Sequence, residues 1–556
     1  MYELVVRGGT VLDGTGAAAR RADVAVAGGR IAAVDVLDGV RAATEIDATG
    51  RHVMPGFIDA HVHGEAAVFD PDVQLAALRQ GVTTFVLGQD GISYAPAGTA
   101  TLRYVSRYFA PVNGTHPGLD GGPVSVAELL AGYDRAVPLN TVYLMPHGTI
   151  RHGVLGTARR APEPGELAAM RERVERGLSD GAAGLSTGLE YVPGSYADAA
   201  EIGALCAPVG AAGLPYVTHM RGYESAAGTA MAEVLEIARI GRVAPHVSHY
   251  HGPRDELIAL VDDARAEGID LTFDSYPYLR GCSTLTLVTL PDRLPIADLD
   301  ATLDALADPS VREWLHRDWF AHRAEVWPRI VLSHVPSGAY RWAEGMSLPD
   351  AAERAGSSPG EFCCDLLVAT RLEAGCVFGQ PPTNSDESMR ALLRHPVHMA
   401  GSDAVYQGGH PHPRGWGAFA RLLARHVRDL GDWTWEEAAA HLAGRAADRF
   451  RLADRGRVEA GPRRRPRRRG SRRRHRSRHL RGPENARGGH RPRARQRRPR
   501  PRRRCSDGER RPAGASAEAG WSGIMSGMNP PSGDWITVVT YENLPRCPRP
   551  VAALLG

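Results

Sequence analysis

The sequence contains no lysine: all 67 basic residues among its 556 residues are arginine. This absence excludes three kinds of catalytic group, namely a Schiff-base lysine, the lysine of a phosphate-binding P-loop, and a carbamylated lysine that bridges two metal ions. A site that needs a cationic or bridging group must therefore use arginine, histidine or a carboxylate.

Cysteine and long apolar runs are also scarce. The seven cysteines form no CxxC pair and show no spacing typical of a disulfide framework, so we expect reduced thiols. No stretch of 18 apolar residues occurs, and the N-terminal residues lack a basic segment followed by an apolar run. We therefore expect neither membrane insertion nor export, and we expect a cytoplasmic location.

The small net charge of +4 is the sum of two unlike parts. Residues 1–460 hold 41 Arg and 57 Asp or Glu, a net charge of −16, whereas residues 461–556 hold 26 Arg and 6 Asp or Glu, a net charge of +20. The acidic part is long enough to bury a large core, and the two parts need separate explanations.

Two strand patterns divide the acidic part. Residues 1–50 alternate short β-rich pieces with glycine turns, which predicts a small antiparallel sheet, and we place a β-subdomain at residues 1–54. From residue 55 onward, short apolar runs alternate with helical segments, which predicts a parallel sheet. The expected strands are residues 56–61, 83–87, 141–146, 184–189, 215–219, 246–249, 270–274 and 398–403. Eight strands are what a (β/α)8 TIM barrel needs, and we place this barrel at residues 55–450 of an α/β protein.

A long stretch separates the last two expected strands. Residues 279–394 contain helices of their own and an apolar run at residues 329–333. An insertion of this length above the mouth of a barrel often covers the substrate. We therefore expect these residues to form a substrate-covering subdomain.

Polar residues that can bind a metal ion follow most of the expected strands. His61 and His63 close the first strand, and because residues i and i+2 of a strand point to the same side, both rings can face one ion. The other residues at strand ends are Glu190, Tyr191, His219, His249 and Asp403. Barrel enzymes draw their catalytic groups from these strand ends, so the set predicts a metal-dependent enzyme.

These residues lie in motifs that resemble the amidohydrolase superfamily and, more closely, its N-acyl-D-amino-acid deacylases (D-aminoacylases). The matching segments include PGFIDAHVH at 55–63, GLSTGLEYVPG at 184–194, THMR at 218–221, GSD at 401–403 and HPHPRG at 410–415. The resemblance covers about residues 1–460. It implies a TIM barrel with a small β-sandwich subdomain, to which C-terminal strands normally contribute. It also implies zinc-dependent hydrolysis of N-acyl-D-amino acids to a carboxylate and a free D-amino acid.

The resemblance assigns roles to individual residues. It implies metal ligands at His61, His63, His219 and His249, a catalytic aspartate at Asp403 and an oxyanion-stabilising tyrosine at Tyr191. A bound Zn²⁺ lowers the pKa of its water to about 7 and polarises the amide carbonyl. Asp403 would take a proton from that water and pass it to the leaving amine.

Two positions depart from the deacylase pattern. Where those enzymes typically have Asn-Cys-Gly with a zinc-binding cysteine, this chain has Gln89, Asp90 and Gly91, and where they commonly carry an apolar residue it has Glu190. Because no lysine or matching cysteine is available, Glu190 is the preferred anionic ligand and could bridge two ions, and Asp90 is the second candidate. Asp90 is also consistent with a turn aspartate that bonds its own backbone. One or two zinc ions are both compatible with these residues.

Four residues are expected to bind the substrate. The resemblance matches Arg414 to an arginine whose planar fork suits a carboxylate, and Tyr276 and Ser283 to a tyrosine and a serine, with Cys282 as the alternative register for the serine. Where the deacylases often have a lysine, this chain has His251, which is only partly charged at neutral pH. A hydantoinase-like cyclic-amide hydrolase and a D-dipeptidase are the alternative activities, although the missing lysine argues against an ordinary hydantoinase.

The basic part begins with a segment rich in arginine and proline. Residues 461–511 hold 24 Arg, 3 Asp or Glu and no aromatic residue. A nucleic-acid-binding arm is one interpretation and a disordered segment is another. We favour a shifted reading frame, because synonymous codons allow the next frame to encode strands rich in valine and aspartate, which disfavours nucleic acid as a partner. This hypothesis predicts disorder over residues 451–511, a tail of unknown role at 512–556, and unpaired edges in the N-terminal sheet.

Overall fold

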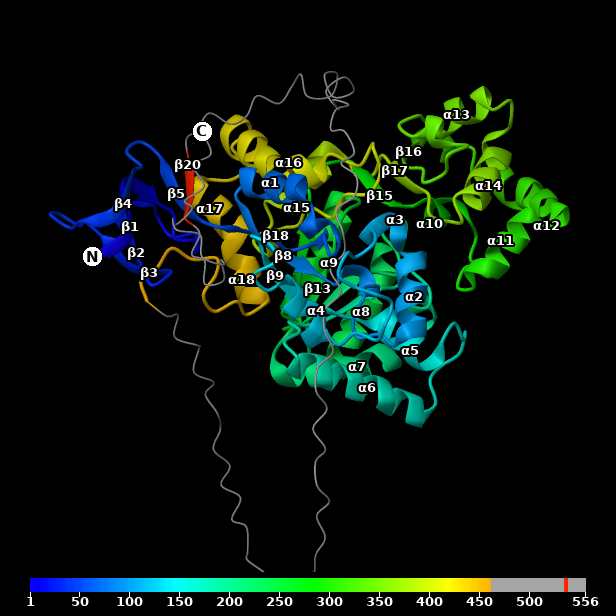
Figure 1. Ribbon diagram of the computed structural model, residues 1–556, viewed down its shortest axis with the longest axis horizontal. Coiled ribbons are helices and arrows are strands. Elements are labelled where there is room, and N and C mark those ends of the chain that lie inside the picture. The colour runs from blue at the N-terminus through cyan, green and yellow to red at the C-terminus, as the bar shows by residue number, and fades with distance from the viewer. Residues whose placement is uncertain (462–534, 539–556) are drawn as a thin grey trace, which may run out of the picture. The chain divides into compact units, whose positions relative to one another are not determined.

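The computed structural model describes residues 1–461 and 535–538 (Figure 1). The shifted frame, the disordered segment and the nucleic-acid arm predicted for the arginine-rich part fall almost entirely outside these residues. Among the described helices, none has the length and apolar character needed to cross a membrane.

The N-terminal region forms a six-stranded sheet. Its strands are β1 (Tyr2–Val11), β2 (Arg20–Ala27), β3 (Arg30–Asp35), β4 (Ala42–Asp47), β5 (His52–Pro55) and β20 (Trp535–Val538), in the order β20-β5-β1-β2-β3, with β4 beside β1. The expected antiparallel pairing is confirmed for β1, β2 and β3, but it is wrong for β4 and β5, which are both parallel to β1. The ten residues of β1 are long enough to pair with β4 along Tyr2–Arg7 and with β5 at Thr10 and Val11.

Segments from the far end of the chain complete this sheet. Val458 is buried in the same apolar cluster as Leu4, Val24 and Val53, and its N–H donates to the Asp13 carbonyl at 3.1 Å. β20 pairs in parallel with β5 along its whole length. The prediction of unpaired edges in this sheet is therefore wrong at β5, because β20 occupies that edge.

The eight strands expected for the barrel are confirmed, and neighbouring strands are parallel. They are β6 (Phe57–Asp59), β8 (Val82–Leu87), β9 (Asn140–Tyr143) with β10 (Met145–Pro146), β11 (Leu185–Gly188), β12 (Pro215–His219), β13 (Ala244–Val247), β14 (Thr272–Ser275) and β18 (His398–Ala400). The helices that accompany them are α1 (Pro71–Arg79), α2 (Thr99–Tyr108), α3 (Ala110–Asn113), α4 (Val126–Tyr133), α5 (His147–Leu155), α6 (Pro164–Ser179), α7 (Ala199–Ala212), α8 (Ala227–Gly241), α9 (Arg254–Ala266), α15 (Asp386–Leu393), α16 (Arg414–Arg421), α17 (Trp435–Ala439) and α18 (Arg445–Arg449).

The strand ladder is divided into arcs rather than closed into one ring. One arc is β6-β8-β9, and the other is β10-β11-β12-β13-β14-β18. Single backbone hydrogen bonds join the arcs, from Leu144 N–H to the Leu87 carbonyl at 3.0 Å and from Ala60 N–H to the Ala400 carbonyl at 3.1 Å. Beyond this junction β7 (Val62–His63) pairs with β19 (Ala404–Val405), which brings the first and last strands together.

The insertion between β14 and β18 has a sheet and a core of its own. Its strands β15 (Arg280–Thr284), β16 (Ile330–His334) and β17 (Gly375–Gly379) are antiparallel in the order β15-β17-β16. Its helices are α10 (Leu285–Thr289), α11 (Leu299–Ala307), α12 (Pro309–Trp314), α13 (Leu348–Arg354) and α14 (Pro359–Ala369). Cys363, Cys364 and Cys376 are free thiols inside this core, as expected for reduced cysteines.

Candidate metal centre and substrate pocket

Four buried histidines converge where the barrel strands end. His61 and His63 flank the start of β7, His219 ends β12 and His249 follows β13. The Nδ1 atom of His219 lies 2.9 Å from Nε2 of His249, and the ring centroids of His61 and His249 are 5.1 Å apart. His63 Nδ1 lies 3.2 Å from the Asn113 side-chain oxygen, so a proton on Nδ1 leaves Nε2 free to face the centre.

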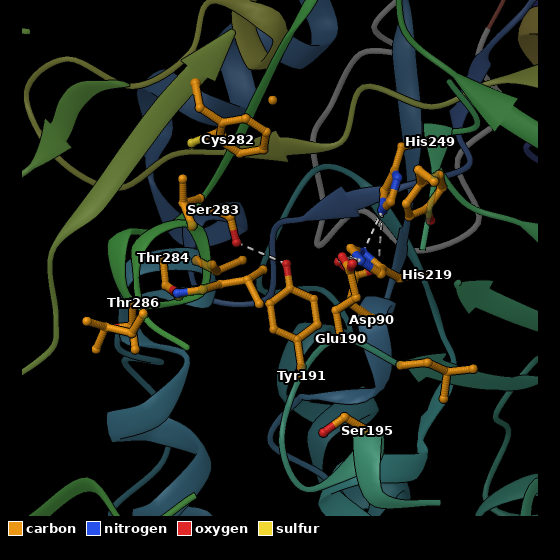
Figure 2. Close-up of a pocket in the computed structure, with 18 of the residues that line it drawn as sticks. Asp90, Glu190, Tyr191, Ser195, His219, His249, Cys282, Ser283, Thr284 and Thr286 are labelled. Carbon is orange, nitrogen blue, oxygen red and sulfur yellow. Dashed lines mark hydrogen bonds and ion pairs between the residues drawn. The ribbon is translucent and has the colours of Figure 1, made fainter. Parts of the chain in front are cut away.

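The Asp90 carboxylate lies among all four histidines, and Figure 2 shows it beside His219 and His249. Its oxygens are 3.6 Å from His61 Nε2, 3.5 Å from His63 Nε2, 3.7 Å from His219 Nδ1 and 3.9 Å from His249 Nε2. The turn after β8 that carries Asp90 is tight, with φ of 54° at Asp90 and 77° at Gly88. A Cβ at Gly88 would meet the Leu144 carbonyl oxygen at 2.3 Å, so only glycine fits there.

Asp403 approaches the same centre from the strand beside β6. Its Oδ1 is 3.6 Å from Nε2 of both His61 and His63, and its Oδ2 pairs with Arg414 Nη1 at 2.8 Å. Burial alone would raise the pKa of Asp403, but the Arg414 guanidinium and the nearby histidines outweigh it and lower the pKa to about 2. The carboxylate is therefore ionised at neutral pH, with Oδ1 directed to the histidines.

The chemistry of these side chains suits a bound cation. Two groups of three residues could each hold an ion, because the ligand atoms within a group lie within 4.8 Å of one another. One group is His61, His63 and Asp403, and the other is His61, Asp90 and His249. Both ring nitrogens of His61 and Oδ1 of Asp90 are buried without a hydrogen-bond partner among the described residues. Unpaired buried polar atoms are costly, and imidazole with carboxylate is a ligand set that Zn²⁺ accepts. The two groups share His61, so the site fits one ion or two.

Residues 44–463 match the model of the amidohydrolase family. The chain belongs to this family. Amidohydrolase relatives of similar length are N-acyl-D-glutamate deacylase and D-aminoacylase of Alcaligenes xylosoxydans xylosoxydans. Each is 32% identical, and the matches cover 83% of this chain and 85% and 86% of the two relatives, respectively.

Solved structures of deacylases match most of the chain. N-acyl-D-glutamate deacylase from Bordetella bronchiseptica, complexed with zinc and a phosphonate that mimics the tetrahedral intermediate, gives a TM-score of 0.68 at 28% identity. The match covers 83% of this chain and 88% of that one. D-aminoacylase gives a TM-score of 0.67 at 30% identity with the same coverage, and a further D-aminoacylase structure concerns a binuclear metal centre.

Glu190 lies beside this amidohydrolase centre rather than inside it. Its Oε2 is 2.7 Å from Nε2 of His219, on the opposite side of the ring from Asp90, and its side chain is 39% exposed. Neither of the two ligand groups includes it. The structure thus brings Asp90 among the histidines and leaves Glu190 in contact with one of them.

Three of the four expected substrate-binding residues line a cavity of about 770 Å³ in front of the histidines, whereas Arg414 lies buried outside its lining. Tyr191, His251, Tyr276 and Ser283 line it, and Cys282 does so as well. The Tyr191 hydroxyl lies 3.0 Å from the Ser283 hydroxyl, and Figure 2 shows this contact between a barrel strand end and the insertion. In the register of this structure, the hydroxyl beside Tyr191 therefore belongs to Ser283.

Arg414 and His251 are held by protein groups. Arg414 is fully buried, pairs with Asp403, and lies with its guanidinium carbon 4.7 Å from the centre of the Tyr276 ring. The His251 Nδ1–H donates to the His249 carbonyl at 2.8 Å, because a carbonyl oxygen can only accept, and the His251 ring stacks on Tyr223. Burial lowers the pKa of His251, so its ring is neutral at neutral pH.

Sequence reasoning missed Asp274, which organises the histidines from behind. Its carboxylate accepts the His249 backbone N–H at 2.9 Å, contacts His246 Nε2 at 2.9 Å and lies 3.6 Å from His61 Nδ1. Burial would raise the pKa of Asp274, but His61 and His246 hold it far below its usual range. The available signal was its position at the end of a barrel strand, where the other site residues also lie.

Asp59 is a second buried carboxylate that was missed. It accepts the Ser402 N–H at 2.7 Å and the Ser402 hydroxyl at 2.5 Å, and so ties β6 to the turn that carries Asp403. Burial raises the pKa of Asp59 to about 7. Because it faces Ser402 rather than the cavity, its contacts support the site without entering it.

Proposed function

We propose that this amidohydrolase cleaves the amide bond of N-acyl-D-amino acids with the help of zinc, releasing a carboxylate and a free D-amino acid. The observation that carries the proposal is the approach of Asp403 Oδ1 to His61 and His63, beside a cavity large enough for such a substrate. The activities named for the two Alcaligenes relatives support the same chemistry.

The residues that would hold zinc are the four histidines together with Asp90 and Asp403. Asp90 is our candidate for the anionic ligand in place of the family's cysteine, since it lies within 3.9 Å of a ring nitrogen of every histidine. When bound, zinc lowers the pKa of the attacking water and polarises the amide carbonyl. The eight strands, whose first and last members are joined at β7 and β19, support a TIM-type barrel around this site.

Asp403 is the group that would hold and move the proton. Its Oδ2 is engaged by Arg414, so Oδ1 is the oxygen that can accept a proton from attacking water. The same oxygen can then deliver that proton to the amine nitrogen as the amide bond breaks. Arg414 acts here by orienting Asp403 and keeping it ionised, as well as by adding positive charge behind Tyr276.

Tyr191 and the hydroxyls of the cavity would orient the substrate. Burial raises the pKa of Tyr191 well above its usual value, so its phenol stays protonated and can donate to the oxyanion. Tyr276 and Ser283 offer hydroxyl donors for the substrate carboxylate. The neutral ring of His251 gives this carboxylate less charge than a lysine would.

Substitution of the two aspartates tests this proposal. In zinc-loaded protein we expect hydrolysis of N-acetyl-D-amino acids and not of the L forms. Asp403→Asn should lower kcat by about 10³-fold, because it removes a general base, while most of the zinc is retained, because the four histidines and Asp90 still hold the ion. Asp90→Asn should lower the bound zinc itself. Zinc content by elemental analysis and kcat on a D and L substrate panel are the measurements.

The control for these variants is Asp255→Asn, which changes a side chain that is 85% exposed on α9. It should leave both the zinc content and kcat as in the parent protein. Zinc-replete protein that hydrolyses none of the N-acyl-D-amino acids would contradict the proposed function. Equal zinc content in Asp90→Asn and the parent would contradict the ligand role of Asp90.

A further inference from the structure

Glu190 is a carboxylate at the wall of the cavity that the proposed reaction does not use. It follows β11, lines the cavity and is 39% exposed, whereas its partner His219 is 9% exposed. In Figure 2 Glu190 lies beside Asp90 and His219. Its carboxylate contacts His219, with Oε2 2.7 Å from Nε2 of the ring.

This contact decides which nitrogen of His219 carries a proton. An ionised carboxylate can only accept, so Nε2 is the protonated nitrogen. The lone pair of a neutral His219 is then on Nδ1, the atom that lies 3.7 Å from Asp90 Oδ2 and 2.9 Å from His249 Nε2. A metal-ligating histidine commonly has its second nitrogen held in this way by a carboxylate.

The same carboxylate puts negative charge on the cavity wall. Arg221 lines the same cavity two residues after His219, but its guanidinium is already paired with Glu233 at 2.9 Å and donates to the Ser195 carbonyl. A substrate that brings one carboxylate for Tyr276 and Ser283 can still be accepted. A second carboxylate in the cavity would be repelled by Glu190, since like charges repel appreciably at the effective dielectric of a partly buried site.

We propose that Glu190 is a positioning residue that presents Nδ1 of His219 to the metal, and that it also selects against substrates with a second carboxylate. The substrate part of this inference rests on the proposed deacylase activity, whereas the metal part does not. Acidic side chains, as in N-acyl-D-glutamate, and acidic acyl groups, as in N-succinyl compounds, are both disfavoured.

The metal part is tested by two variants that separate acceptor from charge. Glu190→Gln keeps an oxygen that accepts the Nε2 proton, and Glu190→Leu removes it. Competition with a zinc chelator should reveal zinc affinity about 10- to 100-fold lower in Glu190→Leu, with most of this loss rescued in Glu190→Gln. Thermal unfolding of the zinc-free proteins checks that both variants fold. Equal zinc affinity in the parent and Glu190→Leu overturns the positioning role.

The selection is tested by kcat/KM on N-acetyl-D-leucine, N-acetyl-D-glutamate and N-succinyl-D-leucine. In Glu190→Gln the preference for the first substrate over the other two should fall about 10-fold. Asp292→Asn is the matched control, because it removes another cavity-lining carboxylate that is 94% exposed and screened by solvent. An unchanged preference in Glu190→Gln overturns the selection, whereas failure to hydrolyse N-acetyl-D-leucine at all counts against the proposed function instead.

Discussion

His398 and His441 form a buried pair of imidazoles away from the cavity. Their Nδ1 atoms are 2.9 Å apart, Arg445 lies beside them, and Asp274 and His395 are the other charged or titratable groups that influence His398. Burial and the Arg445 charge lower the pKa of His398 to about 3, against an ordinary value of 6.5. Burial likewise holds the pKa of His441 well below its usual value. Both rings are therefore neutral in the folded protein.

This pair predicts a loss of stability in mild acid. Because the folded pKa is below the unfolded one, the unfolded chain takes up the proton first, and stability falls as pH drops below about 6.5. Each histidine should remove about 1.4 kcal/mol from the free energy of unfolding between pH 7.5 and 5.5. Denaturant unfolding at the two pH values measures this. In His441→Gln the pH dependence should be smaller; the same dependence as the parent would contradict the assignment.

At the scale of elements, the edge strand β20 is the least expected feature. It pairs in parallel with β5, from Trp535 beside His52 to Val538 beside Pro55, and it occupies an edge that would otherwise offer unpaired backbone groups. The strand joins the sheet from the far end of the chain, after residues that the structure does not describe. β20 contributes backbone hydrogen bonds to the sheet, and a substitution that removes one of these bonds can measure that contribution.

Proline substitution tests this strand. In a strand, alternate N–H groups face the neighbour, so only one of Ile536→Pro and Thr537→Pro removes a hydrogen bond to β5. We expect that variant to melt at a lower temperature and to associate more readily at high concentration, while the other serves as its matched control. Thermal unfolding and sedimentation at two concentrations are the measurements. Two variants that both behave like the parent would show that β20 does not stabilise the sheet.

The sequence was sufficient for the barrel strands but not for the N-terminal pairing. Each barrel strand is a short apolar run with a local pattern, and all eight appear at the expected places. The parallel pairing of β1 with β4 and β5 depends on contacts between residues far apart in the sequence, which periodicity does not contain. The insertion could also be predicted from the sequence, because its length and the apolar run that forms β16 are visible there.

Residue types alone could not show whether Asp90 or Glu190 lies closer to the four histidines. Both are carboxylates at strand ends, and only the backbone at Asp90, with φ of 54° between Gly88 and Gly91, directs its side chain among the histidines. The sequence identified both carboxylates as candidate ligands. The structure places Asp90 within 3.9 Å of a ring nitrogen of all four histidines and Glu190 against His219. Arg414 is similar, because its pairing with Asp403 depends on how β18 and α16 approach each other.

For the whole molecule, the candidate ligands join distant parts of the chain. His63, Asp90, His219 and Asp403 come from four different strand ends, and the Asp403 N–H also donates to the His61 carbonyl at 2.7 Å. An unfolded chain cannot hold these groups together. An ion that binds them therefore favours the folded state through its binding free energy.

Metal removal should consequently destabilise the protein as a whole. With free zinc at about 100 times its dissociation constant, the expected gain in folding free energy is about 2.7 kcal/mol. Thermal unfolding with zinc or with a chelator should differ by a few degrees, and Mg²⁺, which prefers oxygen ligands, should have little effect. Identical unfolding temperatures with and without zinc would contradict binding at this site.

The contact between Tyr191 and Ser283 has a consequence for proton counting. Each hydroxyl has one proton, and in the structure one proton lies between the two oxygens at 3.0 Å. If the phenol turns its proton toward a substrate oxyanion, Ser283 must become the donor or find another acceptor. Ser283 is thus a competitor for the phenol proton, and a substrate carboxylate that draws the Ser283 hydroxyl away from Tyr191 removes this competition. Recognition of one end of the substrate thereby frees the hydrogen bond needed at the other.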